Sequence, residues 1–350
     1  MPGTCQPQQA FMVLNHHAAT GSAGHIFTNQ AKVGKGSKLA QASEQAIPII
    51  GTISAVRPKR RIWRKKILPW LFIAPILLLH LTVVMGPSLA AIYYSLTDWS
   101  GIGPATYIGL ENFRTLIFDD MAYRSALGNN LTWLALFMTI PFVLALATAY
   151  LLAQVVRGSM FFRTMLFLPY ILPSVISAAI WRNLLSPRVG VGAQLELLGI
   201  TGLDFAWLGN PKTALFSIAF VDNWHFWGFL MVLFLAAMQN ISPDLYDAAK
   251  IDGANRWREF VHITIPGIRP TLVFMLMMVG IWSFLSFEYI WILTQGGPAG
   301  SSEVLAVLVY KQAFNRFEAG YAAAIGLSMS FFAGLVIGLF VLLRRMGWEI

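Results

Sequence analysis

Charged side chains are scarce in this chain of 350 residues, because Asp, Glu, Lys and Arg together make up only 12% of it. Hydrophobic residues make up 57%, and the mean hydropathy is +0.62. Globular proteins carry about 25% charged residues, so this chain has too few charges to cover a surface that faces water. The composition excludes a typical soluble enzyme, a disordered protein and a nucleic-acid-binding domain. It indicates a protein that crosses a membrane several times.

Cysteine is almost absent as well. The single Cys5 excludes an intrachain disulfide and a cysteine metal cluster. His16, His17 and His25 lie close together, but no acid or thiol at a suitable spacing completes a set of ligands. The sequence therefore predicts no metal site.

The positive net charge belongs to one end of the chain. Residues 1–66 contain 10 Lys and Arg and one acid, Glu44, which gives +9, whereas residues 67–350 contain 15 basic and 15 acidic residues, which gives zero. The first part of this segment is polar and is predicted to be largely disordered. It ends in RPKRRIWRKK at 57–66, directly before a long apolar run, which is the pattern of a cytoplasmic flank. We expect residues 1–66 to form a cytoplasmic, lipid-facing arm.

The rest of the chain, residues 67–345, is predicted to be a transmembrane domain. A membrane-spanning helix needs about 20 apolar residues. Six segments qualify, at about 68–95, within 125–156, and at 163–185, 213–238, 270–294 and 320–343. With both termini cytoplasmic, 18 Lys and Arg lie inside and seven outside, as the positive-inside rule requires. The expected fold class is all-α, a polytopic membrane protein with six transmembrane helices. Gly334 and Gly338 offer close helix approach in the sixth span, although plain packing explains them as well.

The segment between the fourth and fifth spans, residues 242–268, has the pattern of a short protruding helix–turn–helix. Ser242 and Pro243 are typical of a helix start, and Gly253 permits a sharp exit. A second short helix is expected at about 255–262. A plain interfacial helix pair is the alternative.

The spacing in this loop resembles the cytoplasmic loop of the ABC importer permeases. That loop has the form Glu-Ala-Ala, three residues, Gly, nine residues, Ile, one residue, Leu-Pro. This chain has Asp247-Ala248-Ala249, Gly253, Ile263 and Ile265-Pro266 at the same spacing. Two positions depart from the family pattern, Asp247 for Glu and Ile265 for Leu.

Other stretches resemble the sugar-permease branch of this family, the binding-protein-dependent permeases of the maltose and sn-glycerol-3-phosphate type, across about residues 67–345. These are 107–113, Asn129-Asn130, 167–169 with Pro173, 294–298 and 320–323. The resemblance implies the type I ABC importer permease fold. It implies a permease subunit that imports a sugar, or a related glycoside or polyol phosphate, across a bacterial inner membrane.

The resemblance also implies partners. They are a homodimer of ATP-binding subunits, a second homologous permease that forms a heterodimer with this chain, an extracytoplasmic solute-binding protein and membrane lipid, with no nucleic acid. Coupling to the ATPase would use Asp247, Ala248, Ala249, Asp252, Gly253, Ile263 and Pro266.

No phosphate-binding Gly-x-x-x-x-Gly-Lys-Ser/Thr pattern occurs here, and the similar Val33–Ser37 stretch has the wrong order. The chain is therefore predicted to be a transport subunit without catalytic residues or a cofactor of its own. ATP and Mg²⁺ would be used by the partner ATPase.

Charged groups inside spans are costly and often mark a transport path. Sugars favour hydrogen-bonding side chains beside an aromatic face, which makes Asp222, Asn223, Trp224, His225 and Glu288 the candidates for the substrate path. A buried structural pair is the alternative.

Other function classes stay open. An ion-coupled secondary transporter could use Asp222 and Glu288, but it has no reason to present the 242–268 loop. An intramembrane enzyme has no support, because the sequence contains neither His-Glu-x-x-His nor Gly-x-Ser-x-Gly. An interaction protein built on the permease fold is a further alternative. The sequence does not state which sugar is carried.

Overall fold

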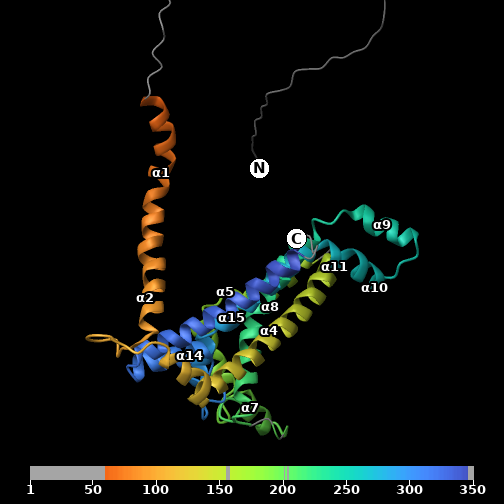
Figure 1. Cartoon of the computed structure of the whole chain (residues 1–350). Helices are drawn as coiled ribbons and strands as arrows, with labels where there is room; N and C mark the ends of the chain where they lie inside the picture. The colour runs from red at the N-terminus through yellow and green to blue at the C-terminus, as the bar shows by residue number, and fades with distance from the viewer. Residues whose placement is uncertain (1–59, 155–157, 201, 203–204, 346–350) are drawn as a thin grey trace, which may run out of the picture. The chain divides into compact units, whose positions relative to one another are not determined.

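The computed structural model describes residues 60–154, 158–200, 202 and 205–345. The chain divides into two units, Met1–Lys66 and Ile67–Ile350. Up to residue 59, the predicted disordered arm lies outside the described residues. Residues 60–66 form the first part of helix α1 (Arg60–His80). The described residues of the second unit form helices and one short hairpin (Figure 1).

Helix α1 continues through a π-helical turn, Leu81–Met85, into α2 (Gly86–Tyr94). The hairpin pairs strands β1 (Thr97–Asp98) and β2 (Thr106–Tyr107) in antiparallel fashion. The further helices are α3 (Glu111–Arg114), α4 (Met121–Gln154), α5 (Ser159–Ile171), α6 (Ser174–Leu184), α7 (Val191–Leu197), α8 (Ala214–Met238), α9 (Pro243–Ile251), α10 (Arg256–Glu259), α11 (Ile265–Gly267), α12 (Arg269–Leu285), α13 (Glu288–Thr294), α14 (Leu305–Tyr310) and α15 (Ala319–Arg345). Three more π-helical turns occupy Thr115–Asp119, Phe260–Thr264 and Lys311–Asn315.

Within the described residues, five helical segments are long and apolar enough to cross a membrane, namely Leu68–Tyr94, Met121–Gln154, Ala214–Met238, Arg269–Thr294 and Ala319–Arg345. The predicted third span, 163–185, is not a single helix. It is the pair α5 and α6, bent by 95°, and the spans number six if this pair crosses once. Leu172 is extended at the bend (φ −71°, ψ 133°) because the ring of Pro173 disfavours the helical conformation in the residue before it.

The fifth span has a break of a different origin. Helix α12 ends at Leu285 and α13 begins at Glu288, and Phe287 between them is not helical (φ −136°). Neither Pro nor Gly lies between the two helices. The sequence therefore gave no local signal for this break, and the predicted span 270–294 is two helices joined by a short non-helical link.

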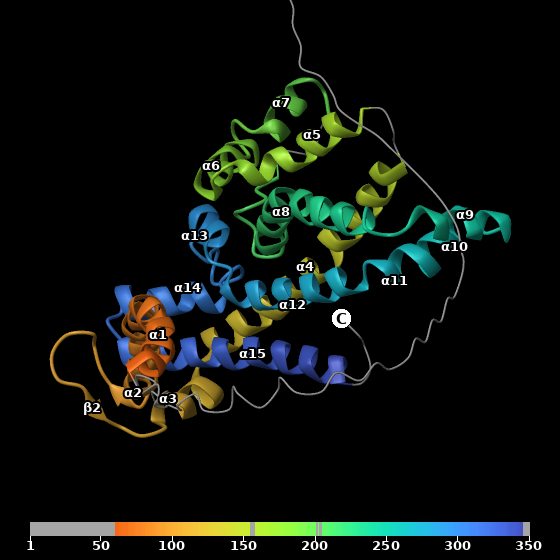
Figure 2. The same ribbon diagram turned by 90° about the horizontal axis from the view of Figure 1, so that it is seen from above.

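The core of the second unit lies between α4 and α8, which pack along each other. Trp133 from α4 and Ile218, Leu230 and Phe234 from α8 are fully buried there. Helix α12 packs on α4 and runs beside α15, and α5 packs on α8 (Figure 2). A smaller core cluster joins the start of α4 to α14 and α15. This arrangement holds the two broken spans against α8.

The neighbouring asparagines at the start of the second span tie segments together. Asn130 is fully buried, donates to the carbonyl of Ser283 (2.9 Å) and accepts from the amide of Leu305 (2.7 Å). Asn129 donates to the carbonyls of Gly300 and Glu303 (3.2 and 2.8 Å). Buried amides with partners on both ends lock the relative positions of α4, α12 and α14.

The first span has a different environment from the others. Every residue from 68 to 89 is exposed, and burial begins only at the end of α2, where this helix packs on α15. The apolar surface of this helix must therefore face lipid or another chain.

Close helix approach occurs at Gly228 rather than at Gly334 and Gly338. A Cβ atom at Gly228 would lie 2.0 Å from the carbonyl oxygen of Leu166, so the backbones of α5 and α8 touch here. Around Gly334 and Gly338, a Cβ atom would meet nothing within 4 Å. These two glycines mediate no contact within the described residues.

We expect Gly228→Ala to weaken the fold and Gly334→Ala to leave it intact. The new methyl group at 228 forces α5 away from α8, and overpacking of this kind costs about 1–3 kcal/mol. Thermal unfolding of the detergent-solubilised variants measures the difference. Equal melting temperatures for both variants would contradict the close contact between α5 and α8.

Candidate functional site

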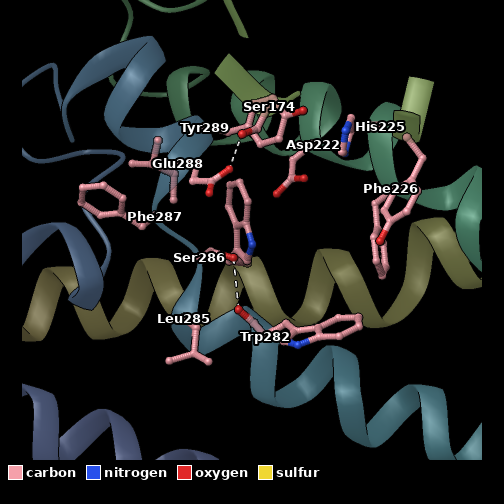
Figure 3. A pocket seen from close by; sticks show the side chains of 13 residues that line it. Ser174, Asp222, His225, Phe226, Trp282, Leu285, Ser286, Phe287, Glu288 and Tyr289 are labelled. Carbon is pink, nitrogen blue, oxygen red and sulfur yellow. Dashed lines mark hydrogen bonds between the residues drawn. The ribbon is translucent and has the colours of Figure 1, made fainter. Parts of the chain in front are cut away.

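A cavity of about 600 Å³ lies among α4, α5, α6, α8 and the break between α12 and α13. A second cavity of about 130 Å³ shares Asp222, Phe226, Trp282 and Ser286 with it. Figure 3 shows the side chains that line the larger one, which are Trp133, Tyr170, Ser174, Asp222, His225, Phe226, Trp282, Leu285, Ser286, Phe287, Glu288, Tyr289 and Ile290. Six of these residues are aromatic, and both helix breaks contribute to the wall.

Helix α8 supplies two titratable groups to this cavity. Asp222 and His225 are three residues apart, so they share one face of the helix, as the sequence predicted. The Nε2 atom of His225 lies 3.0 Å from the carbonyl oxygen of Leu172, which can only accept, so Nε2 carries the proton. The ring thus satisfies a carbonyl that the bend between α5 and α6 leaves without a helical partner.

Glu288 enters the cavity from the other break. It is the first residue of α13, where free backbone amides favour a negative charge. The hydroxyl of Ser174, the first residue of α6, donates a hydrogen bond to its carboxylate (Figure 3). This contact joins the two breaks, and the carboxylates of Glu288 and Asp222 point into the same space.

Two predicted candidates lie away from the cavity wall. Asn223 is only 4% exposed, and its amide donates to the carbonyl of Ala219 within α8 (2.7 Å). The ring of Trp224 packs edge-on against Trp181, with centroids 5.3 Å apart. The structure therefore brings Asp222, His225 and Glu288 together and places Asn223 and Trp224 in packing positions.

The sequence reasoning missed most of the aromatic wall. Phe226 lies one turn after Asp222 on α8, so helical spacing alone could have found it. Ser174 follows Pro173, which marks the bend. Trp133, Tyr170 and Trp282 come from three other helices and had no local signal. Aromatic faces beside a few hydrogen-bonding groups suit a polyhydroxylated ligand. Among the described residues, no group of three or more His, Cys, Asp or Glu side chains is placed to hold a metal ion.

The second candidate site is the loop that α9, α10 and the π-helical turn Phe260–Thr264 form beyond the ends of α8 and α12 (Figures 1 and 2). Ser242 precedes α9 as predicted, but its side chain makes no capping bond. Gly253 has a φ of +77°, which favours glycine and allows the reversal between α9 and α10. The predicted second helix at 255–262 is α10 and the π-helical turn, and Asn255 caps it by accepting from the amide of Arg258 (2.9 Å).

The loop is fixed to itself and to the bundle. Tyr246 of α9 and Thr264 share a hydrogen bond of 3.0 Å, and Tyr150 of α4 donates to the carbonyl of Arg256 (2.9 Å). Lys250 donates to Asp247 (3.0 Å), and this bond raises the pKa of the lysine ammonium above its usual value.

The outer surface of the loop carries most of the residues that the family pattern singles out. The exposed ones are Asp247, Ala248, Asp252, Gly253 and Pro266, and Ala249 and Ile263 are partly buried. Large apolar side chains lie among them, with Ile251 87% exposed and Trp257 70% exposed. Ile251 and Trp257 thus leave apolar surface on the loop that the rest of the described residues do not cover.

Comparison with known proteins decides the family. A model of the binding-protein-dependent transport system inner membrane components matches residues 142–346, more than half of the chain. The chain belongs to this family. It is similar to the probable ABC transporter permease protein YurN of Bacillus subtilis (strain 168), with 36% identity over 75% of this chain and 90% of that one. It is also similar to the diacetylchitobiose uptake system permease protein NgcF of Streptomyces coelicolor, with 33% identity over 79% of this chain and 81% of that one.

Solved structures agree with this assignment. A bacterial ABC transporter that imports the acidic polysaccharide alginate matches with a TM-score of 0.70 and 25% identity, over 83% of this chain and 99% of that one. The permease described here is thus an inner-membrane component of an ABC transporter with the all-α fold expected from its sequence. Its relatives are transport subunits rather than enzymes.

We expect Tyr246→Phe to loosen α9. Loss of the bond to Thr264 removes about 1 kcal/mol, so the amides of residues 243–251 should exchange with deuterium about fivefold faster. Hydrogen–deuterium exchange with mass spectrometry measures this rate. Tyr107→Phe on the exposed strand β2 is the matched control and should change nothing in the loop. Unchanged exchange in Tyr246→Phe would contradict the role of this contact.

Proposed function

We propose that this chain is one permease subunit of an ATP-driven, binding-protein-dependent importer of a sugar or related glycoside. The observation that carries the proposal is the cavity, where six aromatic rings surround the carboxyl groups of Asp222 and Glu288. Aromatic rings offer faces for the apolar side of a sugar ring, and carboxyl groups offer partners for its hydroxyls. The names of similar proteins support a saccharide, since one is a diacetylchitobiose uptake permease and another belongs to a transporter that imports alginate.

The proposal assigns coupling to the loop between α8 and α12. Its residues 242–268 would dock on a separate ATP-binding subunit, with Asp247, Gly253 and the exposed Ile251 at the contact. This assignment places the loop, the arm of residues 1–66 and both termini on the cytoplasmic side. Support comes from the protruding shape of the loop, its exposed apolar side chains and its match to the family spacing.

ATP and Mg²⁺ then belong to a partner homodimer, and a second homologous permease completes the translocation path. Closure of the ATP-binding subunits would push the loop, and the packed helices α8 and α12 on either side of it would move as rigid rods. Switching of this kind is a rigid-body change between packed states. A solute-binding protein on the other side would deliver the sugar, and support for it comes from a solved relative in complex with an alginate-bound periplasmic protein.

An ion-coupled secondary transporter is the second candidate, since Asp222 and Glu288 could carry a coupling ion. Purification of a tagged chain in gentle detergent, with mass spectrometry of the proteins that copurify, separates the two. The proposal expects an ATP-binding subunit and a second six-span permease. A chain that is purified alone and supports uptake driven by an ion gradient would overturn it.

We expect Ile251→Asp to reduce copurification of the ATP-binding subunit at least about tenfold. Burial of an Ile side chain in a groove is worth roughly 1.5–3 kcal/mol, and an Asp at the same place reverses that gain. The band intensity of the copurified subunit measures the effect. Ile102→Asp is the matched control, because Ile102 is also highly exposed (78%) but lies far from the loop in the sequence. Equal losses in both variants would contradict docking at Ile251.

We expect Asp222→Asn to lower sugar uptake about tenfold while the complex still assembles. A hydrogen bond to a charged group is worth roughly 1.5–3 kcal/mol, so its loss slows passage of a hydroxylated ligand. Uptake of labelled sugar into cells measures transport, and copurification of the partners measures assembly. Glu196→Gln in α7, an exposed position outside the cavity, should transport normally. Normal kinetics in Asp222→Asn would remove this residue from the path.

A further inference from the structure

The charges around the cavity have one sign. Asp222 and Glu288 are the acids among the lining residues, and none of the residues that line the two adjoining cavities is Lys or Arg. The one basic ring, His225, directs its Nε2 hydrogen to the carbonyl of Leu172. Whether ionised or protonated, a carboxyl group offers an anion no positive charge.

The same wall offers neutral hydrogen-bonding groups. Trp133 is fully buried, and among the described residues its indole Nε1 has no acceptor. A buried donor without a partner is costly, so such a group is positioned to bind a ligand or water oxygen. Ser174 and Ser286 add hydroxyls to the wall. The polar side chains of the cavity therefore suit hydroxyl, acetamido or ammonium groups of a ligand.

We propose that this cavity passes uncharged or amine-bearing glycosides and rejects anionic ones, such as uronates and phosphorylated sugars. This inference rests on the proposed function of the cavity as the sugar path. It narrows that function, since the relative of similar structure imports an acidic polysaccharide. The shared fold therefore does not determine which charge a substrate may carry. The residues that line the cavity determine it.

The physical reason is the desolvation of charge. A carboxylate or phosphate that enters a cavity among transmembrane helices loses water and needs a cation or several donors in return. Here it would meet two acidic groups, and like charges repel strongly where the dielectric constant is low. An ammonium group is instead attracted by the two acidic groups. An uncharged sugar loses no hydration of a charge and is not repelled by them.

A single-cysteine experiment measures this charge preference directly, since Cys5 is the one native cysteine. Ser286→Cys in a Cys5→Ser background places a thiol on the wall that both cavities share. The intact complex in membrane vesicles is treated with two thiosulfonate reagents of similar size, one bearing an ammonium group and one a sulfonate. Ile102→Cys in the same Cys5→Ser background serves as the reference, because it measures the ratio of the two rates at an exposed position.

We expect the ratio of ammonium to sulfonate rates at 286 to exceed the ratio at 102 by at least about tenfold. Adding Asp222→Asn and Glu288→Gln should bring the two ratios together, whereas Glu196→Gln should leave the difference unchanged. Equal rates for both reagents at 286, or a ratio that survives neutralisation of both acids, would overturn the inference. A thiol at 286 that reacts with neither reagent would instead contradict the cavity as a water-filled path, and so the proposed function.

Uptake by cells provides the second test. Cells with and without this chain are offered labelled uncharged, amine-bearing, uronate and phosphorylated saccharides. We expect that removal of the chain abolishes uptake only of uncharged or amine-bearing compounds. Loss of uronate or sugar-phosphate uptake would overturn the charge rule while it supports the transport function, and no loss of any uptake would overturn both.

Discussion

The need to satisfy every backbone polar group inside a membrane governs this structure. A helix does so by itself, and non-helical backbone is tolerated only where protein covers it or water reaches it. The chain departs from the helix at Leu172–Pro173 and at Ser286–Phe287, and both breaks lie at one cavity. His225 bonds the carbonyl freed at the first break, and Ser174 and Glu288 connect the two. The irregular backbone and the polar cavity are therefore one feature.

The two candidate sites are connected through the chain itself. Helix α8 carries Asp222 and His225 and runs to Met238, just before the exposed loop, and α12 returns from that loop and ends at the second break. Two packed helices thus connect the region of the loop to the cavity. In the proposed function, a displacement of the loop reaches the cavity wall along α8 and α12, since packed interiors transmit strain.

Much of the fold follows from the sequence, because long apolar runs require helices and helix starts carry local signals. The loop at 242–268 was predictable from Pro243, Gly253 and the family spacing, and Asp222 and His225 from their spacing on one helix. The break at Phe287 was not predictable, since no Pro or Gly marks it and tertiary packing decides it. The aromatic wall was not predictable either, because Trp133, Tyr170 and Trp282 are distant in sequence and converge only in the folded chain. The packing of Trp224 outside the cavity wall was not predictable for the same reason, since its partner Trp181 belongs to a different span.

The exposed stretch from Leu68 to Leu89 has a consequence for how the protein is made. Because these residues gain nothing from burial against later helices, the segment can settle in lipid as soon as it has been synthesised. Wherever lipid covers this helix, exchanges among Leu, Ile, Val and Phe should be tolerated during evolution, because lipid requires apolar character and no particular shape. Helix α8 is under the opposite selection, since its buried residues contact α4 and α5 and must keep their shape as well as their apolar character.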